Sequence, residues 1–236
     1  MSLLECRGLT KRYGRTAALS CVDLTLESGR IIGLAGPNGS GKTTLIKLIQ
    51  HLLTPTSGEI LVDGNHPGTE TKKIVSYLPD RDFLPDWMNL HELLTFYEKF
   101  FADFNRGKAM NMLSHLGLEI GSNTPLKKMS KGTREKVQLI LTMSRDAKVY
   151  LLDEPIAGVD PATRDYIIRT IITNYSENAL VLISTHLIAD VEPVLDEVIF
   201  LKDGSIYLHE STDSIRERTG QSIDHYFREV FKCSEN

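Results

Sequence analysis

Short apolar runs, separated by turns that contain glycine and proline, follow one another along most of this chain. The segments at residues 31–35, 149–152 and 180–183 are apolar throughout, which is typical of strands buried on both faces. Residues 161–174 show helical spacing with Pro161 in the first turn, so a helix is expected between two of these strands. The alternation of buried strand and helix predicts an α/β fold.

Shorter extended segments are expected toward both ends of the chain. The first is followed by a polar turn through Tyr13, and the last two form a hairpin across Asp203 and Gly204. Two short helices complete the chain, and Ser222 begins the second of them. The expected short strands lie at residues 3–6, 21–26, 59–62, 74–78, 198–201 and 205–208.

A change in composition marks a helical insertion in the α/β body. Aromatic residues gather at its start, and helical spacing begins near Leu90 and recurs at residues 106–116 and 130–145. The aromatic stripe is either helix core or an exposed docking face around Trp87, the sole tryptophan. We expect one domain over 1–236, with an α/β core from 1–84 and 146–210, a helical subdomain at 85–145 and short C-terminal helices at 211–236.

Length and composition fit an ordinary globular domain. The chain has 236 residues, 25% of them charged and 41% hydrophobic, and a net charge of −4 gives no basic surface for nucleic acid. No apolar run reaches the roughly 18 residues needed to span a bilayer, and the N-terminus lacks a signal-peptide pattern. Cys6, Cys21 and Cys233 are too few and scattered for a disulfide framework or a zinc site, which fits a reducing cytoplasm.

A glycine-rich loop joins the strand at 31–35 to a helical run at 45–49, and this context favours a phosphate-binding P-loop. Its residues are Gly36, Pro37, Asn38, Gly39, Ser40, Gly41, Lys42, Thr43 and Thr44. Glycines let successive N–H groups converge on one anion at a helix N-terminus. Lys42 is expected to reach the β- and γ-phosphates and Thr43 to bind Mg²⁺. The alternative is a glycine-rich turn without a ligand.

Polar residues follow two of the buried strands. Asp153 and Glu154 end the strand at 149–152, and His186 follows the strand at 180–183. Ligands of open α/β sheets bind at this edge, so Asp153 is expected on Mg²⁺ and Glu154 on a water attacking the γ-phosphate. His186 would donate to a γ-phosphate oxygen. The alternatives are an ordinary polar cap on a strand and a structural histidine.

Together these residues resemble the ATP-binding subunit of ABC transporters over about residues 3–208. Residues 36–44 match the Walker A motif and 149–153 the Walker B motif, with Glu154 in the place of the catalytic glutamate. His186 matches the switch histidine. The resemblance implies ATP and Mg²⁺ as ligands.

Three further matches extend the resemblance. Tyr13 stands where the family stacks an aromatic ring on adenine; packing against the protein is the alternative. Residues 157–160 match the D-loop, and 129–133 occupy the place of the signature motif. The nucleotide contacts implied there are Asp160, Ser130 and Gly132.

Two positions depart from the family pattern. The signature has Lys131 where glycine is usual and Thr133 for glutamine, and whether Lys131 adds charge at the phosphates or points away is open. Asp80 stands where the family has the Q-loop glutamine. A carboxylate there can bind Mg²⁺, although its charge could slow the reaction.

The resemblance implies a P-loop NTPase (RecA-like) core with an N-terminal antiparallel β subdomain and an inserted α-helical subdomain. Two cassettes, identical or different, would face each other with ATP between the Walker A motif of one and the signature of the other. The implied partner is an integral membrane permease, docked near Phe83 and Trp87 on the cytoplasmic face of the membrane. The forms of residues 77–80 and 129–133 look most like bacterial ABC-2 exporters, without indicating the substrate; an importer subunit is also compatible.

Two other interpretations stay open. One is a soluble ABC ATPase of translation or DNA maintenance, although such relatives carry two cassettes or long coiled-coil insertions. The other is a degenerate cassette that holds ATP as a structural ligand, which Asp80 and the altered signature favour. Intact Lys42, Asp153, Glu154 and His186 speak against degeneracy.

Overall fold

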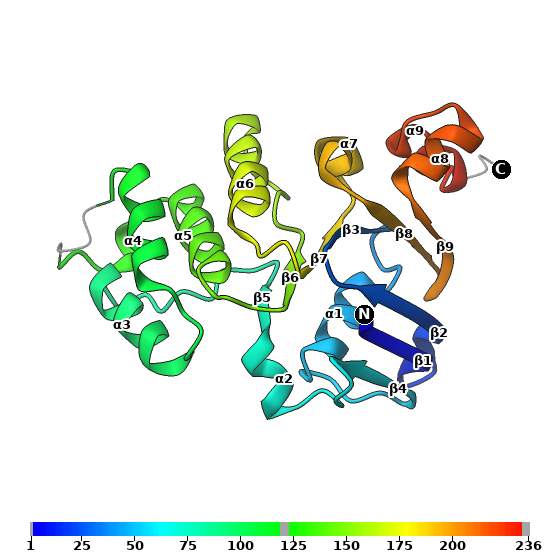
Figure 1. Cartoon of the computed structure of the whole chain (residues 1–236), viewed down its shortest axis with the longest axis horizontal. Coiled ribbons are helices and arrows are strands. Elements are labelled where there is room, and N and C mark those ends of the chain that lie inside the picture. The colour runs from blue at the N-terminus through cyan, green and yellow to red at the C-terminus, as the bar shows by residue number, and fades with distance from the viewer. Residues whose placement is uncertain (1, 119–122, 233–236) are drawn as a thin grey trace.

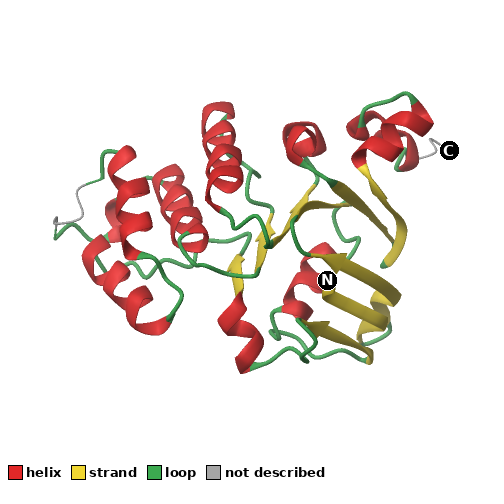
Figure 2. Cartoon of the chain, viewed as in Figure 1, coloured by secondary structure: helices red, strands yellow, loops and turns green. Residues whose placement is uncertain are grey.

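A computed structural model describes residues 2–118 and 123–232, so Cys233 lies outside the described part. The strands gather in one half of the molecule, and the helices α3, α4 and α5 stand together beyond it (Figures 1 and 2). The strands are β1 Ser2–Tyr13, β2 Thr16–Glu27, β3 Arg30–Ala35, β4 Ser57–Val62, β5 Val75–Leu78, β6 Val149–Asp153, β7 Leu180–Thr185, β8 Glu197–Lys202 and β9 Ser205–Ser211. The α-helices are α1 Lys42–Ile49, α2 Thr69–Ile74, α3 Leu90–Phe100, α4 Arg106–His115, α5 Lys131–Met143, α6 Pro161–Asn174, α7 Ile188–Val191, α8 Thr212–Thr219 and α9 Ile223–Val230.

The larger sheet has the strand order β5-β6-β7-β3-β8-β9, parallel from β5 to β8 and antiparallel at β9. Its central strands are apolar on both faces because helices cover both. Ile32 and Leu182 belong to the core that includes α1, whereas Ile31 and Val181 belong to the core that includes α6. The predicted α/β class is confirmed by this topology.

A smaller antiparallel sheet, β2-β1-β4, packs over α1 in the same core. The expectation of short strands here is wrong, because β1 and β2 each run for 12 residues. The pairing of β1 with β2 shifts register at four points. These irregularities let the two strands continue through polar and glycine residues that would otherwise interrupt a strand. The predicted antiparallel β unit is therefore present, with longer strands.

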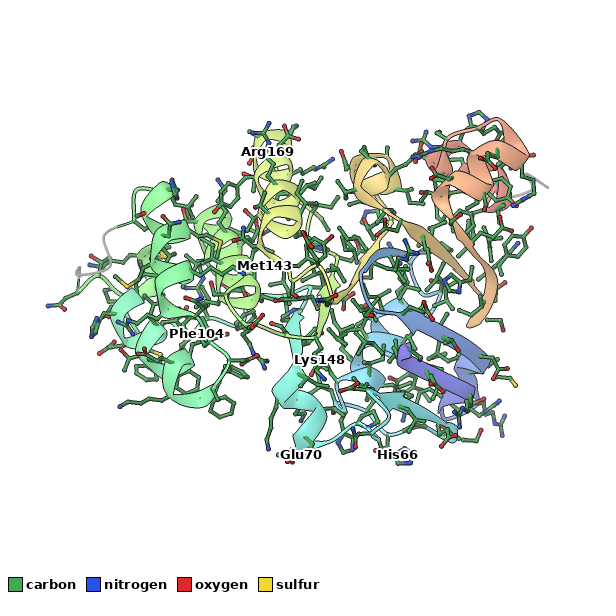
Figure 3. The ribbon with its side chains drawn as sticks, viewed as in Figure 1. His66, Glu70, Phe104, Met143, Lys148 and Arg169 are labelled. Carbon is green, nitrogen blue, oxygen red and sulfur yellow. The ribbon has the colours of Figure 1, made fainter. Side chains whose placement is uncertain are left out.

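Helices α3, α4 and α5 share a core of their own, with Leu94, Leu113 and Val137 fully buried in it. Phe104 lies among these helices in Figure 3. Part of the aromatic stripe belongs to the helix core, because Tyr97 and Phe101 pack partly into it. The other part is exposed: Phe96 and Phe100 are 46% and 68% exposed. Subdomain boundaries at 85 and 145 stay a prediction.

Two short helices were not expected. The chain was predicted as strand from residue 74, but Ile74 ends helix α2, and α7 follows shortly after His186. Helices of six and four residues are too short to show a periodic pattern. Thr71 holds the start of α2 by accepting the N–H of Gly68, and α7 packs through Ile188 on the C-terminal helices.

The C-terminal helices α8 and α9 pack on β8 around the buried ring of Phe200. Ser222 begins α9 as predicted, and its hydroxyl accepts a hydrogen bond from the N–H of His225 at 3.2 Å. Within the described residues, no helix has the length and apolar character needed to cross a membrane.

Candidate nucleotide-binding site

The loop between β3 and α1 has a shape that only glycine allows at two positions. Gly41 has a φ of 111°, and a Cβ there would lie 2.5 Å from the carbonyl oxygen of Ala18. A Cβ on Gly36 would lie 2.4 Å from the carbonyl oxygen of Leu201. Neighbouring strands therefore press against the loop and hold its backbone around the start of α1.

Lys42 is buried at the start of α1 and binds its own loop. Its Nζ donates to the carbonyl oxygens of Gly36 at 2.7 Å and Pro37 at 3.3 Å, and lies 3.6 Å from Glu154 Oε1. Burial lowers the pKa of Lys42, and the charge of Glu154 offsets part of that effect. Phosphate oxygens could replace the two carbonyls as its acceptors.

Asp153 is fully buried at the end of β6, and its two carboxylate oxygens differ. Oδ1 accepts from Thr43 Oγ1 at 3.2 Å and from Ser184 Oγ at 2.5 Å. Oδ2 has no hydrogen-bond partner among the described residues. Burial raises the pKa of Asp153 although both hydroxyls lower it.

Mg²⁺ fits this arrangement, because a hard cation would satisfy the unpaired oxygen of Asp153 beside the hydroxyl of Thr43. Among the described residues, no group of three or more His, Cys, Asp or Glu side chains could hold a metal ion by itself. The remaining ligands would therefore come from substrate oxygens, as in a nucleotide complex.

Ser184 is a site residue that the sequence reasoning missed. It pairs with Asp153 across the parallel strands β6 and β7, and it accepts the N–H of Glu154 both on its carbonyl at 3.1 Å and on its hydroxyl at 3.0 Å. Glu154 has a φ of 52°, a rare value for a non-glycine residue, and these bonds help to hold it there. The only sign of Ser184 in the sequence is that it is a polar residue at the end of the apolar run 180–183. That this run pairs with the Asp153 strand is seen only in the structure.

Glu154 and His186 contact each other, a pairing that the sequence did not predict. His186 Nδ1 lies 2.9 Å from Glu154 Oε2, and Oε1 of the same carboxylate faces Lys42. The carboxylate is thus held between a ring nitrogen and a buried ammonium group, and this contact fixes its orientation.

A cavity of about 250 Å³ opens beside these groups. Asp80 lines it opposite the P-loop, so the structure brings this predicted residue to the same space as Lys42, Thr43 and Glu154. A second cavity, of about 220 Å³, shares Asp80 and Glu154 and extends to Lys131. The remaining predicted P-loop residues in the first cavity's lining are Asn38, Gly39, Gly41 and Thr44. Ser40 is buried behind it, and its hydroxyl has no partner among the described residues.

Asp153 and His186 do not line the P-loop cavity themselves but hydrogen-bond to its lining residues Thr43 and Glu154. Seven other predicted residues are also absent from the lining: Gly36, Pro37 and Ser40 of the loop, and Tyr13, Ser130, Gly132 and Asp160. Tyr13 ends β1 with 49% of its surface exposed, and Lys11 Nζ lies 5.4 Å from its ring centroid. Ser130 caps α5, where a Cβ on Gly132 would meet no atom within 4 Å. Asp160 caps α6, and hydrogen bonds from Thr163 lower its pKa.

Comparison with known proteins identifies the family. Residues 19–157 match the family model described as ABC transporter, which is more than half of the chain. The ABC transporter ATP-binding protein YtrB of Bacillus subtilis (strain 168) is 30% identical over 220 residues, covering 91% of this chain and 74% of YtrB. The SkfA peptide export ATP-binding protein SkfE of the same organism is 28% identical over 210 residues, covering 87% of this chain and 88% of SkfE.

A solved structure of the ATP-binding subunit of an ABC transporter agrees with the fold throughout. It matches with a TM-score of 0.86 at 27% identity and covers 98% of this chain and 100% of the other. These relatives lend no support to a role in translation or DNA maintenance. The chain therefore belongs to the ABC transporter family, as one of its ATP-binding subunits that hydrolyse ATP.

Proposed function

We propose that this subunit works on the cytoplasmic face of a membrane and powers a permease that exports its substrate. The observation that carries the proposal is a cavity of about 250 Å³ lined by Lys42, Thr43 and Glu154. Asp153 bonds to Thr43 and His186 to Glu154, so both lie beside this lining. Export is supported by the relative SkfE, whose own name refers to peptide export.

The proposed chemistry assigns a task to each of these groups. The P-loop N–H groups and Lys42 bind the phosphates, and Thr43, Asp153 and Asp80 hold Mg²⁺, which neutralises charge on the phosphates when bound. Glu154 accepts a proton from the attacking water. Without nucleotide, His186 orients Glu154 through Nδ1; with ATP bound, its N–H is assigned to the γ-phosphate.

A second cassette, identical or different, would complete the site. Ser130 and Gly132 lie at the exposed start of α5, and Asp160 at the exposed start of α6. None of these residues lines the P-loop cavity of its own chain. We assign Ser130, Gly132 and Asp160 to the ATP held by the facing cassette, and Tyr13 to the adenine of its own ATP.

The permease would dock on the exposed aromatic residues of the helical half. Trp87 is 72% exposed, which suits docking, whereas Phe83 is half-buried between two cores and its N–H donates to Gln138 Oε1 at 2.8 Å. At the other end of α3, an apolar cavity of about 640 Å³ lined by Phe100 and Lys72 offers a second candidate docking surface. The complementary partner is a permease segment with apolar and acidic side chains.

The test is to recover the tagged chain from gently solubilised native membranes and identify what co-purifies. We expect a stoichiometric polytopic membrane protein with the unchanged chain. Trp87→Ala or Phe100→Ala should reduce its recovery about tenfold or more, as for hot-spot residues. The matched control Tyr207→Ala, at an aromatic residue 53% exposed on β9, should leave recovery unchanged.

Two outcomes would contradict the proposal. If only soluble proteins co-purify in several detergents, a permease is not the partner of this subunit. Loss of nucleotide binding in Trp87→Ala, with normal permease recovery, would return Trp87 to a structural role.

A further inference from the structure

The C-terminal helices hold the segment that carries His186. Helix α7 begins two residues after His186, and its first residue, Ile188, is buried in one cluster with Ile215 of α8 and Ile223 of α9. Figure 1 shows α7 at the end of β7, on the side of the sheet where α8 and α9 lie. The backbone that positions the His186 ring therefore packs on the last two helices of the described chain.

Glu192 forms the polar part of this contact. It directly follows α7, and its side chain is only 11% exposed. Oε1 accepts from the N–H of Ile223 at 3.0 Å and from Arg216 at 3.1 Å, and Oε2 accepts from the N–H of Asp224 at 3.2 Å. A nearly buried carboxylate needs such donors, and all three belong to α8 or α9.

The other side of α7 is tied to α6. Asp190 accepts from Arg164 at 2.9 Å, and Arg164 also donates to the carbonyl of Val159 at 3.2 Å, next to the cap residue Asp160. Helix α7 is thus held from both sides by charged contacts. A four-residue helix has too few internal hydrogen bonds to hold its own position, so these contacts set it.

We propose that Glu192 is a positioning residue for ATP hydrolysis, which makes α8 and α9 part of the hydrolytic machinery. Through α7, Glu192 fixes where the His186 ring stands against Glu154. The ring is 43% exposed, and within the described chain its hydrogen bond goes to Glu154, so its place depends on the backbone that carries it. The inference rests on the proposed role of His186.

The first test compares Glu192→Gln with Glu210→Gln. Glutamine keeps the shape of Glu192 but turns an NH₂ group toward N–H donors. Glu210 on β9 makes an ion pair with Arg218 of α8 at 3.0 Å in the same C-terminal region, so it is the matched control. We expect kcat to fall about tenfold in Glu192→Gln with KM for ATP within about twofold of wild type, because small displacements of a reacting group are costly. Glu210→Gln should change neither.

Two further measurements separate positioning from folding. In protein labelled with ¹³C-histidine, the His186 signal, identified by its loss in His186→Gln, should shift or broaden in Glu192→Gln but not in Glu210→Gln. Combined with His186→Ala, Glu192→Gln should reduce kcat by less than about twofold more, because both changes remove the same interaction. Arg216→Gln, which keeps the carboxylate and removes one donor, should lower kcat about threefold.

The results that overturn the inference are distinct. An equal fall of kcat in the presence and absence of the His186 ring would mean that Glu192 only supports the fold. Normal kcat in Glu192→Gln, together with a loss in His186→Ala, would overturn the inference alone. Normal kcat in His186→Ala would remove the proposed role of His186 and the inference with it.

Discussion

Asp153 places a charged oxygen in the protein interior without a partner. Oδ1 has two hydroxyl donors, whereas Oδ2 has none among the described residues. An unpaired buried oxygen destabilises the folded chain, and burial accordingly raises the pKa of Asp153. The same unpaired oxygen favours binding of a cation. The ligand-free fold is therefore less stable at the position where the ligand binds.

Asp153→Asn should make the ligand-free chain more stable and weaken its binding of the cation. Because the amide carries no charge, the free energy of unfolding without ligand should rise by about 1 kcal/mol. The gain in melting temperature from Mg²⁺ with a non-hydrolysable ATP analogue, a linkage effect, should largely disappear. Thermal unfolding with and without ligand checks both, with Asp146→Asn, an exposed aspartate before β6, as control. A full ligand-induced gain in Asp153→Asn would remove Asp153 from the metal site.

The site residues that could be predicted are those specified by neighbours in sequence. Lys42 and Thr43 follow the glycines of a local motif, and Asp153 ends an apolar run. Ser184 could not be found in this way, since its bond to Asp153 depends on the pairing of two strands 31 residues apart. The left-handed backbone of Glu154 depends on the same pairing.

Helix starts show the same contrast between local and distant causes. Ser130, Asp160 and Ser222 each accept an N–H from the residue three positions later, a signal contained within four residues of sequence. Helix α7 has no side-chain cap of this kind, and at the start of α2 the bond runs the other way, from the N–H of Gly68 to the hydroxyl of Thr71 at 2.8 Å. Helix α9 has a second cap from a residue distant in sequence: the carboxylate of Glu192 accepts the N–H groups of Ile223 and Asp224 at the start of the helix.

Glu192 should make stability depend on pH in the acid range. Burial by itself would raise the pKa of Glu192, but N–H donation from Ile223 and Asp224 and the bond from Arg216 lower it overall. A carboxylate with a lowered pKa in the folded state stabilises the fold above its unfolded-state pKa of about 4.3, and this contribution is lost as the pH falls through the folded-state value.

Urea unfolding at several pH values tests this effect. Near pH 7, Glu192→Gln should lower the free energy of unfolding by about 1–2 kcal/mol, as expected for hydrogen bonds to a charged group. The difference from wild type should shrink steadily once the pH falls below about 4. A difference that stays constant with pH would show that the charge of Glu192 contributes nothing.

At the scale of the whole molecule, the predicted nucleotide contacts fall into two groups on different elements. Walker A residues and Glu154 line the P-loop cavity, while Ser130 and Asp160 lie outside its lining on other helices. The fold class and the order of the buried strands and longer helices could be predicted because motifs and apolar runs mark them. Strand order could not, since β3 pairs with β7 and β8, which lie far along the chain.

Glu154→Gln should trap the assembled form. Without the carboxylate to accept a proton, turnover should fall about 100-fold or more, and ATP with Mg²⁺ should hold two chains together. Size-exclusion chromatography with light scattering should give twice the chain mass with ATP and the single mass without it. Glu177→Gln, at an exposed glutamate before β7, is the control. Unchanged turnover in Glu154→Gln would remove Glu154 from its proposed role.

The contact of Lys42 with the carbonyls of its own loop bears on which anions the protein accepts. An entering anion must offer enough new bonds to replace those two contacts. Free orthophosphate occupies one phosphate position and can offer few, whereas a polyphosphate spans the loop N–H groups and reaches the ammonium group as well. We expect the loop to discriminate against a competing product that cells hold at high concentration, and so to stay available for the next nucleotide.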